Sequence, residues 1–173
     1  MKTIGIIGLG VMATRMITNT MAYGGFRIGA AWDLDPGACK RVSTIAPDIR
    51  IVENPDALID DSRLDGIYIA SPPASHVDYA TAAITRGKPV LCEKPLGIDL
   101  EITRRMTETA VTSGVSNAVN FTFATAPAVT KLENALVDGT VGKVAAVDIR
   151  LHFCKWPREW QLPATWLNQR AEG

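Results

Sequence analysis

The sequence is poor in cysteine and in aromatic residues. Its three cysteines, Cys39, Cys92 and Cys154, are far apart and form no C-x-x-C spacing, so neither a disulfide framework nor a zinc site is indicated. Aromatic residues make up 6% of the chain and hydrophobic residues in total 47%, a composition typical of globular proteins. Disordered and fibrous classes are excluded, and we expect a globular protein in a reducing cytoplasm.

An excess of charge of one sign is also missing. Lys and Arg together number 18, equal to the 18 Asp and Glu, so the chain has no broad field to hold nucleic acid or an anionic membrane. No apolar run is as long as a membrane span, and the apolar start is interrupted by Gly5, Gly8 and Gly10, as in a strand followed by a turn. We therefore expect neither nucleic acid nor membrane as a partner, and we expect any anion to be bound locally.

From the start to about residue 121, short apolar runs alternate with segments of helical period, the pattern of repeated βαβ units. The expected strands are Thr3–Gly8, Ile28–Asp33, Ile49–Glu53, Gly66–Ala70, Pro89–Glu93 and Ser116–Phe121. Helix starts are predicted near Pro36 and after Asp99, and helix ends before Gly24 and Gly87. The near-continuous apolar strands indicate an α/β fold, a Rossmann doubly wound parallel sheet covered on both faces.

A glycine-rich turn follows the first expected strand. Gly8-Leu9-Gly10-Val11-Met12-Ala13 matches G-x-G-x-x-G/A in the strand-to-helix context that this fingerprint requires. Gly8 permits the tight turn, Gly10 lets the backbone approach a pyrophosphate, and Ala13 keeps the helix close to the sheet. The amides of the first turn, at Val11 and Met12, would hold the anion at the positive end of the helix.

An acidic residue stands at the end of the second expected strand. Asp33 can accept hydrogen bonds from the ribose hydroxyls of an adenosine, which points to NAD. A 2′-phosphate there would be repelled, but Lys40 and Arg41 could soften the repulsion, so NADP stays open. In the alternative interpretation the glycines only form a tight turn and Asp33 only caps the next segment. The joint register of strand, glycines, helix and acid favours dinucleotide binding.

Two further strand ends carry unusual residues. Ser71-Pro72-Pro73 follows the fourth expected strand, and Glu93-Lys94-Pro95 ends the fifth. Ligands of open α/β sheets lie across the carboxyl ends of the strands, so these loops should face the nicotinamide end of the cofactor. The Lys94 ammonium beside a substrate hydroxyl could stabilise developing alkoxide or donate to a carbonyl oxygen. A lysine before a proline in a loop is otherwise typical of a solvated surface residue.

At these strand ends and at the glycine turn, the sequence resembles the Gfo/Idh/MocA family of oxidoreductases. The resemblance covers nearly the whole chain and is carried by the glycine turn, Ser71-Pro72-Pro73 with His76, Glu93-Lys94-Pro95-Leu96, Asn120-Phe121 and Asp138-Gly139-Thr140-Val141-Gly142-Lys143. It implies a NAD(P)-dependent dehydrogenase or reductase acting on sugars, cyclic polyols or related small molecules.

The resemblance also implies roles for individual residues. Lys94 would be the active-site lysine, and Pro95 would follow a cis peptide bond. Glu93 and Pro72 would lie near the nicotinamide ribose, and Asn120 near the substrate. Ser71 and His76 are placed with the cofactor-binding residues, although packing at a helix start is the alternative for His76.

The pattern changes after Phe121. We expect a helix over Pro127–Val137 and then, over Lys143–Phe153, a strand with alternating polar and apolar residues, whose unpaired edge would favour a homo-oligomer. Residues 1–121 are assigned to the NAD(P)-binding Rossmann domain. Residues 122–173 are assigned to the incomplete beginning of a C-terminal α+β domain for substrate binding or oligomerisation.

Members of the family continue into a large antiparallel sheet with a further acid and histidine. This chain ends before such a segment, so we expect it to bind NAD and to turn over poorly or not at all. Two alternatives to a truncated oxidoreductase stay open. One is a stand-alone NAD(P)-binding sensor or regulatory module without catalysis. The other is a subunit whose missing sheet is supplied by another chain.

Overall fold

The computed structural model describes residues 1–162 and 169. The chain divides into two units, of which the first contains Met1–Asn120 and the second begins at Phe121. Residues 163–168 and 170–173, which belong to the second expected domain, lie outside the described part. No helix among the described residues is long and apolar enough to cross a membrane.

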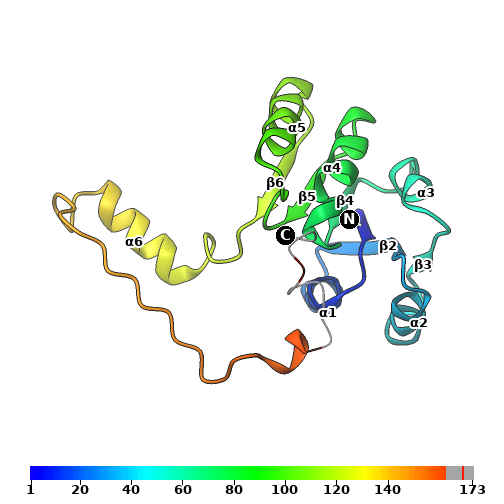
Figure 1. Ribbon diagram of the computed structural model, residues 1–173, viewed down its shortest axis with the longest axis horizontal. Coiled ribbons are helices and arrows are strands. Elements are labelled where there is room, and N and C mark those ends of the chain that lie inside the picture. Colours follow the sequence, from blue (N-terminus) through cyan, green and yellow to red (C-terminus); the bar gives the residue numbers. More distant parts are fainter. Residues whose placement is uncertain (163–168, 170–173) are drawn as a thin grey trace. The chain divides into compact units, whose positions relative to one another are not determined.

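The first unit is built on a six-stranded parallel sheet with the order β3-β2-β1-β4-β5-β6 (Figure 1). The strands are β1 Lys2–Ile7, β2 Phe26–Trp32, β3 Arg50–Ile51, β4 Gly66–Ile69, β5 Val90–Glu93 and β6 Asn117–Asn120. The helices are α1 Val11–Tyr23, α2 Pro36–Ile45, α3 Pro55–Ile59, α4 His76–Thr85 and α5 Leu100–Ser113. The expected Rossmann sheet is confirmed, and its strand order reverses between β1 and β4.

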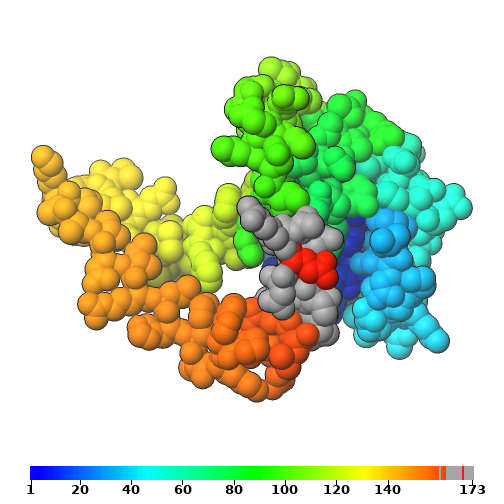
Figure 2. Space-filling view, viewed as in Figure 1, coloured from blue at the N-terminus to red at the C-terminus, as the bar shows by residue number. Residues whose placement is uncertain are grey.

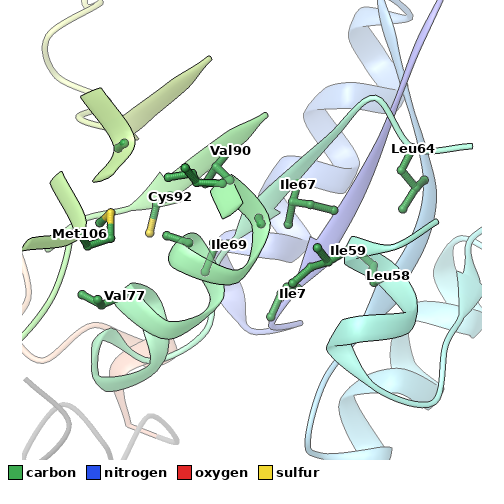
Figure 3. Close-up of a cluster of buried hydrophobic side chains, with 14 of the residues drawn as sticks. Ile7, Leu58, Ile59, Leu64, Ile67, Ile69, Val77, Val90, Cys92 and Met106 are labelled. Carbon is green, nitrogen blue, oxygen red and sulfur yellow. The ribbon is translucent and has the colours of Figure 1, made fainter. Parts of the chain in front are cut away.

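The sheet separates two apolar cores. On one face, Ile6 and Tyr68 pack with residues of α1 and α2 such as Ile17 and Val42. On the other face, Ile7, Leu58, Ile59, Ile69, Val77, Cys92 and Met106 join the sheet to α3, α4 and α5 (Figure 3). Successive residues of a strand point to opposite faces, so a strand covered on both sides must be apolar throughout. This explains why β1 and β4 have no polar alternation.

The helix ends lie where the sequence predicts them. Pro36 is the first residue of α2, and the Asp35 side chain accepts hydrogen bonds from the amides of Gly37 and Ala38. Asp99 caps α5 through the amide of Ile102, at 2.8 Å. Gly24 follows α1 and Gly87 lies two residues beyond α4, both with positive φ. The helix boundaries are therefore set locally by capping side chains and glycines.

The second unit has little packing of its own. Its helix α6, Pro127–Val137, agrees with the expected helix, but none of its residues is buried. Residues 143–153 were expected to form a strand and have no regular secondary structure; their side chains are exposed. A strand needs a neighbouring strand for its backbone groups, and no described residue pairs with this segment. Figure 2 shows the described residues of this unit, coloured yellow to orange, as a thin band of atoms.

Candidate functional site

The turn between β1 and α1 is tight and open to a ligand. The Gly8 amide donates to the Trp32 carbonyl at 2.8 Å, and a Cβ on Gly8 would lie 2.4 Å from the Ser71 nitrogen. Gly8 has φ +89°, which favours glycine. Gly10 is the N-cap of α1 without a capping side chain, and a Cβ there would meet nothing within 4 Å. The uncapped amides and the open space suit an anion.

Asp33 lies just after β2, and its side chain connects the glycine turn to the turn at Asp35. Its carboxylate accepts hydrogen bonds from the Leu9 amide, at 2.5 Å through Oδ2, and from the Asp35 amide, at 2.7 Å through Oδ1. The side chain is half-buried, and each oxygen keeps lone-pair capacity for a further donor. The Arg41 guanidinium lies 3.6 Å from the Asp35 carboxylate. Asp33 is thus fixed beside the glycine turn, where it can accept from hydroxyl groups.

The segment after β4 is held to the segment after β5. The two ring nitrogens of His76 each lie 2.7 Å from a backbone carbonyl oxygen, Nδ1 from that of Pro95 and Nε2 from that of Ser71. The His76 side chain is 1% exposed. His76 therefore joins the two strand-end loops, and its nitrogens are occupied by backbone.

Ser71 and Pro72 lie on the half-buried rim of this edge. The Ser71 hydroxyl lies 2.8 Å from the Ser75 hydroxyl, which also donates to the Pro72 carbonyl at 2.9 Å. These bonds close the short 3₁₀ turn Pro73–Ser75 that leads into α4. The loop therefore presents backbone and a proline ring to the edge rather than a mobile side chain.

Glu93 is a buried carboxylate at the end of β5. The side chain is 4% exposed, and its Oε1 accepts from the Tyr68 hydroxyl and from the Asn120 Nδ2, each at 2.6 Å. Burial raises the pKa of Tyr68 well above its usual range, and the hydrogen bond to Glu93 raises it further. Burial also raises the pKa of the neighbouring Cys92 thiol to about 12, so that thiol stays protonated. The phenol that donates to Glu93 and the thiol of the preceding residue therefore both stay neutral.

Lys94 is exposed and makes no hydrogen bond or ion pair within the described part of the chain. The peptide bond between Lys94 and Pro95 is cis, as the resemblance implies. The ammonium is therefore free to meet a ligand at the carboxyl edge.

The strand register brings these groups to one edge. Ile7 of β1 pairs with Ile69 of β4, Ile69 with Cys92 of β5, and Glu93 with Asn120 of β6. The glycine turn, Ser71, Lys94 and Asn120 each follow or end one of these strands. They lie at the carboxyl ends around the point where the strand order reverses, which is where open α/β sheets bind ligands. No group of residues suited to a metal ion is found among the described residues.

A family model described as "Oxidoreductase family, NAD-binding Rossmann fold" matches residues 2–121. The chain belongs to the Gfo/Idh/MocA family. The first unit of this family member is an NAD-binding Rossmann domain, and its open space at Gly10, uncapped α1 and fixed Asp33 fit the dinucleotide.

Relatives of this Gfo/Idh/MocA chain include "Inositol 2-dehydrogenase 2" of Saccharopolyspora erythraea, 34% identical over 142 residues, covering 81% of this chain and 42% of the relative. "Glucose-6-phosphate 3-dehydrogenase" of Bacillus subtilis is 32% identical over 156 residues, covering 90% and 43%. Among solved structures, a probable dehydrogenase from Thermotoga maritima has a TM-score of 0.77 at 27% identity, covering 82% and 42%. The chain spans less than half the length of these relatives.

Sequence reasoning missed two members of this edge, Tyr68 and Ser75. A signal for Tyr68 was present, because its hydroxyl is the one polar side-chain group in the strand Gly66–Ile69. A buried tyrosine in an otherwise aliphatic strand needs a partner for its hydroxyl. The partner could not be named without the register of β4 and β5.

Proposed function

We propose that this chain binds NAD at the glycine turn and contributes the cofactor side of hydride transfer to or from a sugar, cyclic polyol or related small molecule. Support for the substrate class comes from the names of its relatives, which include an inositol 2-dehydrogenase and a glucose-6-phosphate 3-dehydrogenase. When bound, NAD supplies the hydride acceptor, and its reduced form the donor. Side chains at the carboxyl edge of the sheet are proposed to bind the substrate and to stabilise the charge that develops on it.

One observation carries this proposal: a fixed carboxylate next to an uncapped helix start. The Leu9 amide fixes Asp33 against the glycine turn, so the pyrophosphate and the adenosine ribose can be bound by adjacent groups. In this arrangement Asp33 accepts from both ribose hydroxyls. A 2′-phosphate would bring a second negative charge against Asp33, so NAD is preferred over NADP.

Lys94 is the group proposed to act on the substrate. Its Nζ donates a hydrogen bond to the substrate oxygen and stabilises the negative charge that grows there as the carbon–hydrogen bond breaks. Pro72 and Glu93 border the nicotinamide ribose, and Asn120 borders the substrate. Ser71 contributes its loop backbone, and His76 holds that loop to Pro95.

The whole protein is proposed to have a Rossmann domain over residues 1–121 and a substrate or oligomerisation domain from residue 122 onward, and to act as a homo-oligomer. The division of the chain at Phe121 supports this boundary. A cytoplasmic location belongs to the same proposal and is supported by three free cysteines. If the chain binds NAD but oxidises no sugar or polyol, the binding-module alternative stands.

The test compares wild type with Asp33→Asn in titrations with NADH and NADPH. Asparagine keeps the size of the side chain and an acceptor oxygen but removes the charge. We expect the wild type to bind NADH more tightly than NADPH, and the substitution to reduce that ratio about tenfold or more. The ratio is insensitive to a general loss of folded protein. A wild type that binds neither dinucleotide, or a ratio that does not change, contradicts the proposal.

A further inference from the structure

A buried hydrogen-bonded cluster joins the carboxyl ends of three strands. Tyr68 on β4 pairs in register with Leu91 on β5, and Glu93 lies two residues beyond Leu91 on the same face of the sheet. The Tyr68 hydroxyl reaches Glu93 Oε1 at 2.6 Å, and Asn120 of β6, which pairs with Glu93, reaches the same oxygen at 2.6 Å. Tyr68 and Glu93 are 1% and 4% exposed. The cluster is therefore part of the packed sheet and not a surface contact.

The two oxygens of Glu93 differ in their partners. Both donors converge on Oε1, and no described residue donates to Oε2 or forms an ion pair with the carboxylate. A buried carboxylate without a cation is costly unless its oxygens are hydrogen-bonded. The neutral phenol and amide stabilise the charge without neutralising it. One oxygen is thereby saturated, and the other retains its full capacity to accept.

The position of Glu93 indicates what the second carboxylate oxygen can bind. Glu93 is the last residue of β5 and directly precedes Lys94, at the edge where ligands of such sheets bind. A carboxylate oxygen there suits a vicinal diol, whose hydroxyls need acceptors. The nicotinamide ribose is the diol that the proposed function brings to this edge.

We propose that Tyr68 is a positioning residue: its hydroxyl, together with the Asn120 amide, holds Glu93 Oε1 so that Oε2 accepts from the nicotinamide ribose. This inference rests on the proposed function. Tyr68 touches neither cofactor nor substrate and acts only through Glu93. Loss of its hydroxyl frees the carboxylate to rotate and to lose its orientation toward the ribose.

The experiment measures binding of NADH and of ADP by calorimetry to wild type, Tyr68→Phe, Glu93→Gln and the double variant. ADP lacks the nicotinamide ribose and reports only the adenosine side. Tyr68→Phe keeps the ring that packs under α1 and removes only the hydroxyl. We expect this substitution to weaken NADH binding about tenfold, because one hydrogen bond to a charged group is lost, and to leave ADP binding unchanged. Tyr23→Phe, at the exposed end of α1, removes a phenol hydroxyl far from this edge and is expected to change neither.

The double variant tests whether Tyr68 acts through Glu93. We expect Tyr68→Phe to add little to Glu93→Gln, so the two effects on NADH are not additive. Additive losses, equal losses for NADH and ADP, or no loss in Tyr68→Phe would each overturn the inference while the wild type still binds NADH. A wild type that binds neither nucleotide would overturn the proposed function and this inference with it.

Discussion

The two glycines of the β1–α1 turn have different surroundings. At the scale of single residues, substitution of one should therefore affect stability and substitution of the other should affect cofactor binding. Gly8→Ala forces a left-handed φ of +89° on alanine and drives Cβ to 2.4 Å from the Ser71 nitrogen. We expect a loss of about 2–4 kcal/mol in the free energy of unfolding. Gly10→Ala puts its methyl into open space, so stability should change by less than about 1 kcal/mol while NADH binding weakens about tenfold or more.

Urea unfolding and NADH titration of the two variants check this pair. The matched substitution, glycine to alanine two positions apart, makes each variant the control for the other. Equal losses of stability would contradict the assignment of a steric role to Gly8. Undisturbed NADH binding in Gly10→Ala would contradict a pyrophosphate at this turn.

Residues that belong to a known fingerprint could be predicted from sequence. Gly8, Gly10 and Asp33 belong to a fingerprint of fixed spacing, and the structure brings them together. The contacts of His76 with Pro95 and of Tyr68 with Glu93 could not be predicted in this way. These partners lie 19 and 25 positions away, and only the register of β4 and β5 brings them close. Long-range polar contacts that belong to no known fingerprint are therefore the part of the site that sequence leaves open.

At the scale of elements, Asp61 joins the loop after α3 to strand β3. Its carboxylate, 6% exposed, accepts from the Arg63 side chain and amide and pairs with the Arg50 guanidinium. The Arg63 side-chain hydrogen bond, followed by that of the Arg63 amide, holds the pKa of Asp61 well below its usual range, and Arg50 adds to the effect. A carboxyl whose pKa is lower in the folded state stabilises the fold above its unfolded pKa, about 4. That stabilisation is lost as the pH falls toward the folded pKa.

Asp61→Asn should therefore lower the free energy of unfolding by about 1–2 kcal/mol at neutral pH, since two charged hydrogen bonds are lost but the arginines are partly solvated. The difference from wild type should shrink below about pH 4. Urea unfolding of both proteins at several pH values measures this difference. Asp60→Asn is the control, because its carboxylate, 60% exposed, pairs with Arg86 at the surface and should contribute little. A loss in Asp61→Asn that is equal at all pH values would show packing, not charge, to be responsible.

Elements buried on both faces were predicted to within a few residues, because their apolar runs leave no other arrangement. Strand β3, expected over residues 49–53, is shorter than expected: it is observed as Arg50–Ile51, an edge strand that pairs with β2 alone. Residues 143–153 have the alternation of a strand but no described neighbour to pair with. Alternation specifies a face, whereas a strand also requires a partner for its backbone.

At the scale of the whole molecule, α6 has an apolar stripe that is exposed in the part of the chain that the structure describes. Val129, Leu132 and Leu136 share one helix face and are 41%, 55% and 42% exposed. Exposed stripes of this kind favour association. We expect the chain to self-associate, with a sedimentation coefficient that rises with concentration. Leu132→Glu with Leu136→Glu should reduce this rise. Thr130→Glu with Asn134→Glu adds the same charge on the opposite face of α6 and should leave it unchanged. A wild type that sediments as a monomer at every concentration, or equal effects of the two pairs, would exclude this stripe as the interface.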